Sequence, residues 1–316
     1  AQVALILASP AKPKAAPMAS LLRRLGSTLR PAGGRVATRA AGGIPNPFAD
    51  LQGKVVVCAG AGNPPAEGHG IGALTSLTLA RYGAKVVSVS NVAENCDTVT
   101  KAVLDEGNEG MSYTADCTKM AECEQLLKAV IDKYGKVDVM INAGIHTALP
   151  MGFAKMTEEK WHSNIALNLT AHFNLIHTFL PVFQQQKKGN IMQFTTFGSA
   201  VALGMGNQRH GYFAGKAAAA ILTRRIGIEN AKNGIRANVV SIGYTTGPLV
   251  NRAVAKVGAS LEKVTATRDG NVPRGEQITP DEVASVALFL ASDASSAINA
   301  TEVFADGGNH GVTYGP

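Results

Sequence analysis

The chain has 316 residues, a mass of 32.8 kDa and a hydrophobic content of 46%, so it is large enough to bury one sizeable core. No stretch approaches the ~18 uninterrupted apolar residues that a membrane span requires, which excludes a spanning helix. The formal net charge of +7 would suit a nucleic-acid partner only if it belonged to the folded domain.

The positive charge is confined to the first 49 residues. Seven basic residues and no acid occur there, namely Lys12, Lys14, Arg23, Arg24, Arg30, Arg35 and Arg39. Residues 50–316 therefore carry no net charge, and no nucleic-acid partner is expected. The Arg-rich, acid-free segment that begins at Met18 has the composition of an organellar transit peptide, with a disordered basic tail as the alternative.

We expect residues 1–49 to be a targeting leader and residues 50–316 to form the domain. A transit peptide that begins at Met18 indicates the mitochondrial matrix, whereas the short apolar run from Val3 to Ala8 before it indicates a plastid stroma. Both compartments stay open. The four cysteines form no C-x-x-C pair and have no histidine at metal-like spacing, so reduced thiols and no metal site are expected.

After a breaker-rich stretch at 42–47, apolar runs alternate with helix-length amphipathic segments. Strands are predicted at 54–59, 85–90, 111–115, 137–142, 190–196, 235–241 and 303–304, and helices at 71–82, 92–106, 119–134, 157–184, 211–232 and 280–292. This alternation predicts a single α/β domain with a doubly wound, mostly parallel, Rossmann-like sheet. Such a sheet binds its ligand at the carboxyl ends of the strands, so the site residues should follow the strands.

A glycine-rich turn follows the first predicted strand and leads into the first helix. Gly60, Gly70 and Gly72 allow a tight turn and a close approach of the backbone, and a helix that begins at Ile71 offers N–H groups to a pyrophosphate. This placement predicts a dinucleotide site, with a flexible surface loop as the alternative.

The second predicted strand ends at Ser90 and Asn91, where an NAD site usually carries an acid for the ribose diol. Without that carboxylate a 2′-phosphate is not repelled. We therefore expect NADP as the cofactor, with NAD as the alternative. No arginine stands there to bind the phosphate, and His69 is a possible substitute.

Tyr212 and Lys216 lie four residues apart at the start of a predicted helix, so they share one helix face. A tyrosine hydroxyl titrates near pH ~10, but a neighbouring cation favours the phenolate. The pair predicts a proton donor or acceptor at Tyr212 with Lys216 lowering its pKa. A half-buried tyrosine beside a solvated lysine is the alternative, since such a pair recurs by chance.

From about Gly53 to Gly308 the chain resembles the short-chain dehydrogenase/reductase family. The turn Gly60 to Gly72 is similar to the family's T-G-x-x-x-G-x-G motif, lengthened here and with Ala59 in place of threonine. The other matches are, in order, Asp116, the N-A-G motif Asn142-Ala143-Gly144, Asn168, the Y-x-x-x-K pair Tyr212 and Lys216, and the closing Asp306-Gly307-Gly308.

The resemblance implies a role for each matching residue. Asp116, with Cys117 beside it, would contact the adenine, and the segment from Asn142 to Gly144 would lie near the adenosine ribose. Asn168 would support a proton-relay water, and Lys216 would bind the nicotinamide ribose. These roles are expectations from the family.

The family also places a catalytic serine at the end of the fifth strand, and two residues of this chain compete for that role. Counting thirteen residues back from Tyr212 reaches Ser199, whereas the strand pattern that begins at Gly189 reaches Thr196. A strand fixes position more firmly than a loop does, so Thr196 is preferred and Ser199 stays open.

The chain departs from the family after the sixth strand. The usual Pro-Gly pair is replaced by Ile242-Gly243, and the following threonine position holds Gly247, with Thr245 just ahead of it. Gly243 and Thr245 are therefore the candidates for contact with the nicotinamide. Ala300 stands where a glycine is usual before the last strand.

These observations predict an NAD(P)(H)-dependent oxidoreductase that interconverts a carbonyl and a secondary alcohol of a small-molecule substrate. The altered turn at 242–247 supports an alternative, a weak or inactive structural subunit of an organellar complex. Residues 145–160 and a mobile lid at 245–278 would select the substrate. The resemblance also implies a homodimer or homotetramer built on the helices at 157–184 and 211–232.

Overall fold

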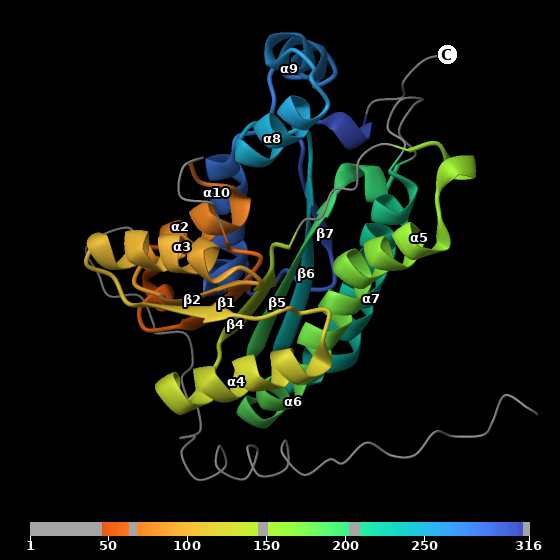
Figure 1. Cartoon of the computed structure of the whole chain (residues 1–316). Coiled ribbons are helices and arrows are strands. Elements are labelled where there is room, and N and C mark those ends of the chain that lie inside the picture. Colours follow the sequence, from red (N-terminus) through yellow and green to blue (C-terminus); the bar gives the residue numbers. More distant parts are fainter. Residues whose placement is uncertain (1–45, 63–67, 145–150, 202–208, 312–316) are drawn as a thin grey trace, which may run out of the picture.

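The computed structural model describes residues 46–62, 68–144, 151–201 and 209–311, so nearly all of the expected leader lies outside the described residues. The described chain folds around one seven-stranded sheet in the order β3-β2-β1-β4-β5-β6-β7 (Figure 1). The strands are β1 (Val55–Ala59), β2 (Lys85–Ser90), β3 (Gly110–Thr114), β4 (Val139–Asn142), β5 (Gly189–Thr196), β6 (Ile235–Ile242) and β7 (Glu302–Ala305). Each pairs in parallel with its neighbours. The predicted doubly wound fold is confirmed.

The strand order reverses between β1 and β4, which lie side by side with Ala59 opposite Asn142. The chain runs outward from β1 through β2 to β3, and then returns to the other side of β1 to continue through β4 to β7. Loops that leave neighbouring strands at such a reversal separate to opposite faces of the sheet, and the crevice between them takes the ligand. The expected location of the site is therefore set by the topology.

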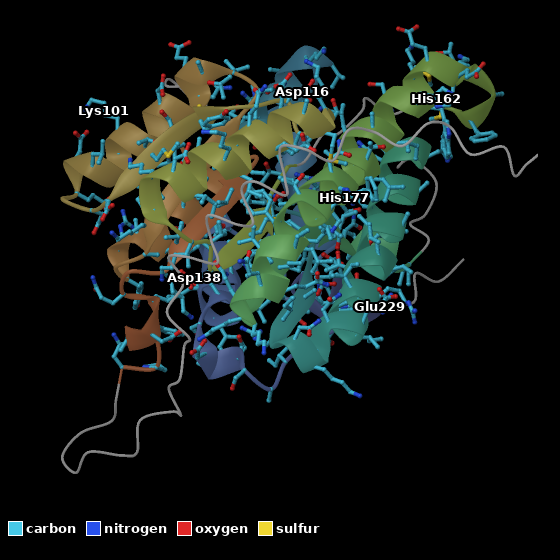
Figure 2. All side chains as sticks on the ribbon, turned by 90° about the horizontal axis from the view of Figure 1, so that it is seen from below. Lys101, Asp116, Asp138, His162, His177 and Glu229 are labelled. Atoms are coloured by element: carbon cyan, nitrogen blue, oxygen red, sulfur yellow. The ribbon has the colours of Figure 1, made fainter. Side chains whose placement is uncertain are left out.

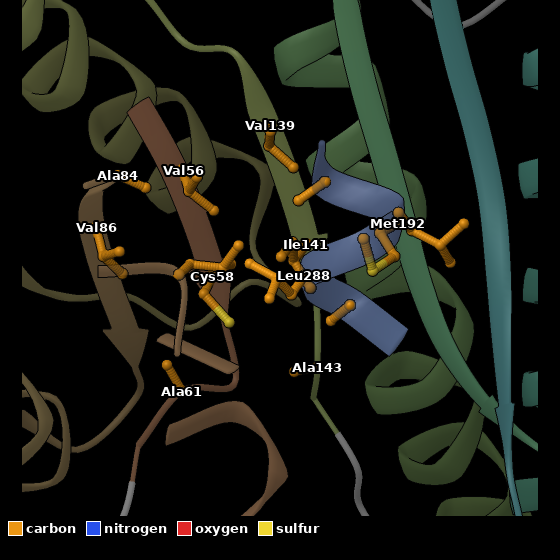
Figure 3. Close-up of a cluster of buried hydrophobic side chains, with 14 of the residues drawn as sticks. Val56, Cys58, Ala61, Ala84, Val86, Val139, Ile141, Ala143, Met192 and Leu288 are labelled. Atoms are coloured by element: carbon orange, nitrogen blue, oxygen red, sulfur yellow. The ribbon is translucent and has the colours of Figure 1, made fainter. Parts of the chain in front are cut away.

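Helices cover both faces of the sheet (Figure 1). One face carries α2 (Ile71–Arg81), α3 (Ala93–Asp105) and α10 (Pro280–Ala291), and the other carries α4 (Met120–Tyr134), α6 (Ala171–Gln186) and α7 (His210–Asn230). Alternate residues of β1 serve the two layers, since Val55 and Val57 join the core under α4 and α6, whereas Val56 and Cys58 join the core under α2 and α10. Figure 3 shows the second core, with Leu288 of α10 against Cys58 and Ile141.

The predicted helix at 157–184 is built from three consecutive segments. They are α5 (Glu158–Ile165), a π-helical turn η3 (Ala166–Thr170) and α6. Thr157 caps the start, because its side chain accepts a hydrogen bond from the Lys160 N–H. The π turn inserts an extra residue into the helix, and π turns of this kind are frequently found at functional sites.

Two further helices, α8 (Pro248–Lys256) and α9 (Leu261–Gly270), occupy the expected lid between β6 and α10. They lie beyond the carboxyl end of β6 (Figure 1). Thr245 forms an isolated parallel bridge with Ile278, so the two ends of this insertion are joined. No described helix is both long and apolar enough to cross a membrane.

Candidate active site

The turn after β1 brings two chain segments into close backbone contact. Gly60 has a left-handed φ of +81°, and a Cβ atom there would lie 2.3 Å from the Gly144 nitrogen after β4. A Cβ atom at Gly72 would lie 2.3 Å from the Gly60 carbonyl oxygen. Glycine is thus required at both positions for the ends of β1 and β4 and the start of α2 to meet.

The first turn of α2 faces this same point. Its N-cap residue, Gly70, brings no side chain to cap the helix, which begins at Ile71. The first N–H groups of a helix favour an anion. The insertion at 63–67, which carries the Pro pair, lies outside the described residues. A glycine-rich turn at the strand reversal, followed by the amino end of a helix, fits the pyrophosphate of a dinucleotide.

The residues expected on the adenosine side lie at the ends of β2 and β3. Ser90 ends β2, its hydroxyl accepts a hydrogen bond from the Val92 N–H, and a Cβ atom at Gly62 would lie 2.4 Å from that hydroxyl. Asn91 follows and is exposed. Therefore Ser90 packs against the glycine turn while Asn91 faces solvent.

Asp116 lies after β3 at the carboxyl edge of the sheet, opposite Asp138 at the amino edge (Figure 2). Partial burial raises the pKa of its carboxyl, but hydrogen bonds from Thr118 and the Lys119 cation outweigh this and hold the pKa below its ordinary value. The carboxylate is therefore an ionised hydrogen-bond acceptor. The carbonyl of Cys117 accepts a hydrogen bond from Asn174 Nδ2 at 3.0 Å, which ties this loop to α6.

The N-A-G segment at the end of β4 is fixed by its own hydrogen bonds. Asn142 Oδ1 accepts from the Gly144 N–H at 3.1 Å, and the Ala143 N–H donates to the Ala59 carbonyl at 2.7 Å. These bonds lock the loop at the strand reversal beside the glycine turn.

Tyr212 is buried on the first turn of α7, and the Thr196 side chain lies close enough to its hydroxyl to lower the pKa of the phenol. Thr196 is the last residue of β5. Ser199 is placed differently, because its Oγ donates to the Thr196 carbonyl at 2.6 Å. The structure therefore brings Thr196 to the phenol, while Ser199 closes the turn after the strand.

Lys216 is fully buried one helical turn after Tyr212. Its Nζ donates to the carbonyls of Gly144, at 2.7 Å, and Phe194, at 3.0 Å. These carbonyls take two of its three N–H donors. Burial lowers the pKa of the Lys216 ammonium to about 7. The lysine thus connects the ends of β4 and β5.

The pKa of the Tyr212 phenol is shifted by burial and by groups other than Lys216, which was the expected one. Burial raises the pKa of Tyr212 to about 12, opposed by the Arg209 cation and by the hydrogen bond from Thr196. Lys216 is not among these causes, and its ammonium donates to two backbone carbonyls. The motif pattern did not identify Arg209. It lies three residues before Tyr212, so the two residues lie on one side of the first helical turn.

Asn168 lies in the π turn and is buried, with its Nδ2 donating to the Asn164 carbonyl at 3.0 Å. Two glycines of α7 face this stretch: a Cβ atom at Gly215 would lie 2.9 Å from Asn168 Cβ, and one at Gly211 would lie 2.8 Å from Asn164 Cβ in α5. These glycines let α7 approach α5 and the π turn closely. As a result Asn168 lies against the helical turn that carries Tyr212 and Lys216.

The loop after β6 is held by the end of β7 and by α9. The Gly243 N–H donates to the Ala305 carbonyl at 3.0 Å, and a Cβ atom at Gly243 would lie 2.6 Å from Asp306 Cα. The Thr245 carbonyl accepts from Arg268 Nη1 at 3.1 Å. Gly247 has a φ of +115° at the N-cap of α8, so the residue that replaces the family's threonine serves the backbone turn.

In the described ranges no three or more His, Cys, Asp or Glu side chains gather as a metal site. The described cysteines are free thiols. The residues brought together at the carboxyl edge are instead hydroxyl, phenol, ammonium and glycine. This set can bind a dinucleotide and exchange a proton with an oxygen atom.

Comparison with known proteins identifies the family. A family model described as enoyl-(acyl carrier protein) reductase matches residues 65–310. The chain is 32% identical over 260 residues to the 3-oxoacyl-[acyl-carrier-protein] reductase FabG of Thermotoga maritima, covering 82% of this chain and 98% of that one. It is 30% identical over 251 residues to the D-beta-hydroxybutyrate dehydrogenase of Cupriavidus necator, covering 76% and 93%.

Solved structures agree with this result. A structure described as a short-chain dehydrogenase/reductase from Burkholderia xenovorans superposes with a TM-score of 0.78 at 30% identity, covering 84% of this chain and 99% of that one. These findings support an enzyme and not the alternative of an inactive structural subunit. The chain therefore belongs to the short-chain dehydrogenase/reductase family of NAD(P)-dependent oxidoreductases, which interconvert carbonyls and alcohols.

Proposed function

We propose that the protein reduces a ketone to a secondary alcohol with Thr196 and Tyr212 as the groups that touch the substrate oxygen. The observation that carries this proposal is the placement of the Thr196 side chain, at the end of β5, beside the Tyr212 phenol. Two O–H groups on rigid elements converge at one point of the carboxyl edge. A carbonyl oxygen placed there receives two donors.

When bound, the reduced nicotinamide supplies the hydride that adds to the carbonyl carbon. Tyr212 gives its phenolic proton to the oxygen, and a phenol whose pKa is raised by burial is fully protonated at neutral pH. Thr196 donates a hydrogen bond to the same oxygen as negative charge develops on it. Lys216 holds the β4 and β5 ends together and offers its third N–H to the ribose. Asn168, on the π turn, would hold the water through which the proton is replaced.

We infer NADP rather than NAD as the preferred cofactor. Ser90 and Asn91 present a hydroxyl and an amide at the end of β2, so no carboxylate repels a 2′-phosphate. Fluorescence titration of the protein with NADPH and NADH tests this directly. Tighter binding of NADPH is expected. Tighter binding of NADH contradicts the preference, and binding of neither contradicts the proposed reaction.

We propose that the substrate contains a ketone or a secondary alcohol. The compounds in the names of three relatives, a 3-oxoacyl group, D-beta-hydroxybutyrate and D-threitol, each contain a ketone or a secondary alcohol.

We propose that the protein forms a homodimer or homotetramer. Such an assembly would cover the outer faces of α6 and α7, where Phe173, Ile221 and Ile228 are 46%, 55% and 60% exposed. Apolar side chains gathered on neighbouring helices favour a protein partner.

We also propose that residues 1–49 direct the protein to a mitochondrial matrix or a plastid stroma. The support is the acid-free, Arg-rich composition of that segment. Import of a fusion of these residues to a fluorescent protein into one organelle and not the other would assign the compartment. A cytosolic fusion would contradict the proposal.

A further inference from the structure

Two arginines flank the hydroxyl pair of the site. Arg209 is the N-cap residue of α7, and its carbonyl accepts a hydrogen bond from the Phe213 N–H at 3.0 Å. Its charge lies close enough to Tyr212 to lower the pKa of the phenol. The Nε of Arg209 is buried, and among the described residues no acceptor reaches it. A donor of this charged group therefore has no protein acceptor, on the residue that caps the helix carrying Tyr212.

Arg268 reaches the same place from α9. Its Cζ lies 5.1 Å from the centre of the Tyr244 ring, and its Nη1 donates to the Thr245 carbonyl and to Gln277 Oε1, both at 3.1 Å. The Tyr244 ring packs edge-on against Phe197, with 5.3 Å between the ring centres. Since Phe197 follows Thr196 directly, these contacts hold the guanidinium over the ends of β5 and β6.

Arg209 and Arg268 lie near each other, and fewer acidic than basic side chains lie beside them. Burial lowers the pKa of Arg268, and the Arg209 charge lowers it further. Asp269 opposes this effect, but its Oδ1 already accepts hydrogen bonds from the N–H and the Nε2 of Gln277. Lys263 adds a third cation, since it lines a shallow depression on α9 together with Arg268. Two half-buried guanidinium groups of like charge are stabilised when an anion lies between them.

We propose that Arg209 and Arg268 bind a carboxylate of the substrate, so that the protein acts on oxo acids and the matching hydroxy acids. This inference rests on the proposed function, because the carboxylate would be held beside a carbonyl that Thr196 and Tyr212 hold. The planar guanidinium fork matches a carboxylate in shape and charge. The pyrophosphate of the cofactor would instead lie at Gly60, Gly72 and the start of α2.

The test is thermal unfolding of the NADP⁺-saturated protein with acetoacetate or with methyl acetoacetate, which differ in the charged group. We expect acetoacetate to stabilise the protein at concentrations about tenfold lower than the ester does. Arg209→Gln and Arg268→Gln should each raise the half-maximal concentration of acetoacetate by about tenfold and leave that of the ester unchanged. Arg81→Gln is the matched control, since Arg81 is exposed on α2 and pairs with Glu106.

Several results would overturn the inference. They are equal stabilisation by acid and ester, stabilisation by neither, or a response to acetoacetate that survives both substitutions. NADPH fluorescence is measured on each variant alongside. Weaker NADPH binding with an unchanged ratio of acid to ester would assign the arginines to the cofactor's phosphates and also overturn the inference. Failure of the wild-type protein to bind NADPH would instead show that the proposed function itself is wrong.

Discussion

Thr196 and Ser199 lie three residues apart, but only Thr196 lies beside the phenol of Tyr212. The Thr196 hydroxyl meets the phenol of Tyr212, whereas the Ser199 hydroxyl is committed to a backbone carbonyl at 2.6 Å. Strand geometry sets this difference, because β5 ends at Thr196 and the next three residues form a short 3₁₀ turn. This rigidity is the reason to prefer the strand pattern, which reaches Thr196, over a fixed count of thirteen residues back from Tyr212, which reaches Ser199.

Substitution of the two hydroxyls separates their roles. Thr196→Ala should lower kcat about 10²- to 10³-fold, because it removes one donor to the developing oxyanion. Thr196→Ser should keep most of the rate, since it retains the O–H group. Ser199→Ala is the control and should change kcat less than about tenfold, at a cost in stability of about 1 kcal/mol for the lost hydrogen bond. A larger loss of kcat for Ser199→Ala than for Thr196→Ala would reverse the assignment.

At the scale of elements, close contact between α7 and the π turn aligns the site. Gly215 is the point of contact, with Asn168 2.9 Å from the position its Cβ would occupy. The sequence predicted one helix over 157–184 and the partner helix at 211–232, and both exist. It did not predict the π turn, because an extra residue in a helix reflects packing against a distant segment, and helical periodicity does not report that packing.

Adding one methyl group tests this contact. Gly215→Ala should destabilise the protein by about 1–3 kcal/mol, because the new Cβ overpacks the interface. It should also lower kcat, because Asn168 and Tyr212 would shift apart. Gly270→Ala, at the end of α9, meets no atom within 4 Å and should be neutral or stabilising by up to about 1 kcal/mol. Urea unfolding and steady-state kinetics of both variants provide the measurements, and equal stability of the two would contradict the account.

At the scale of the whole molecule, the strands and the doubly wound, parallel sheet were predictable from sequence. Most strands are short apolar runs, and the glycine turn, Asp116 and the N-A-G segment each follow a strand end, so local pattern and the general fold together place them. The proximity of Arg209 and Arg268 was not predictable, because they are far apart in the chain and α9 is placed by contacts such as that of Arg268 with Tyr244. The pKa of Tyr212 was also missed, since burial is a property of the assembled fold.

The proposed assembly of two or four copies uses the outer faces of α6 and α7. Ile221→Glu should weaken or abolish a dimer or tetramer, because it places a charge in an apolar contact of two copies. Leu104→Glu is the control, since Leu104 is also exposed, at 52%, but on α3 on the opposite face of the sheet. Sedimentation velocity gives the mass of each variant. A monomeric wild-type protein, or an unchanged assembly in Ile221→Glu, would contradict the proposed interface.

The role of Tyr212 as the proton donor is the central claim, and its substitution by phenylalanine tests it most directly. Tyr212→Phe keeps the buried ring and removes only the hydroxyl, so NADPH binding measured by fluorescence should be retained. The rate of ketone reduction should fall by about 10²- to 10⁴-fold, the usual contribution of a general acid. In the wild-type protein, alcohol oxidation should accelerate as the pH rises, because the phenol with its raised pKa must lose its proton to accept another. Near-normal reduction by Tyr212→Phe with intact NADPH binding would show that another group donates the proton.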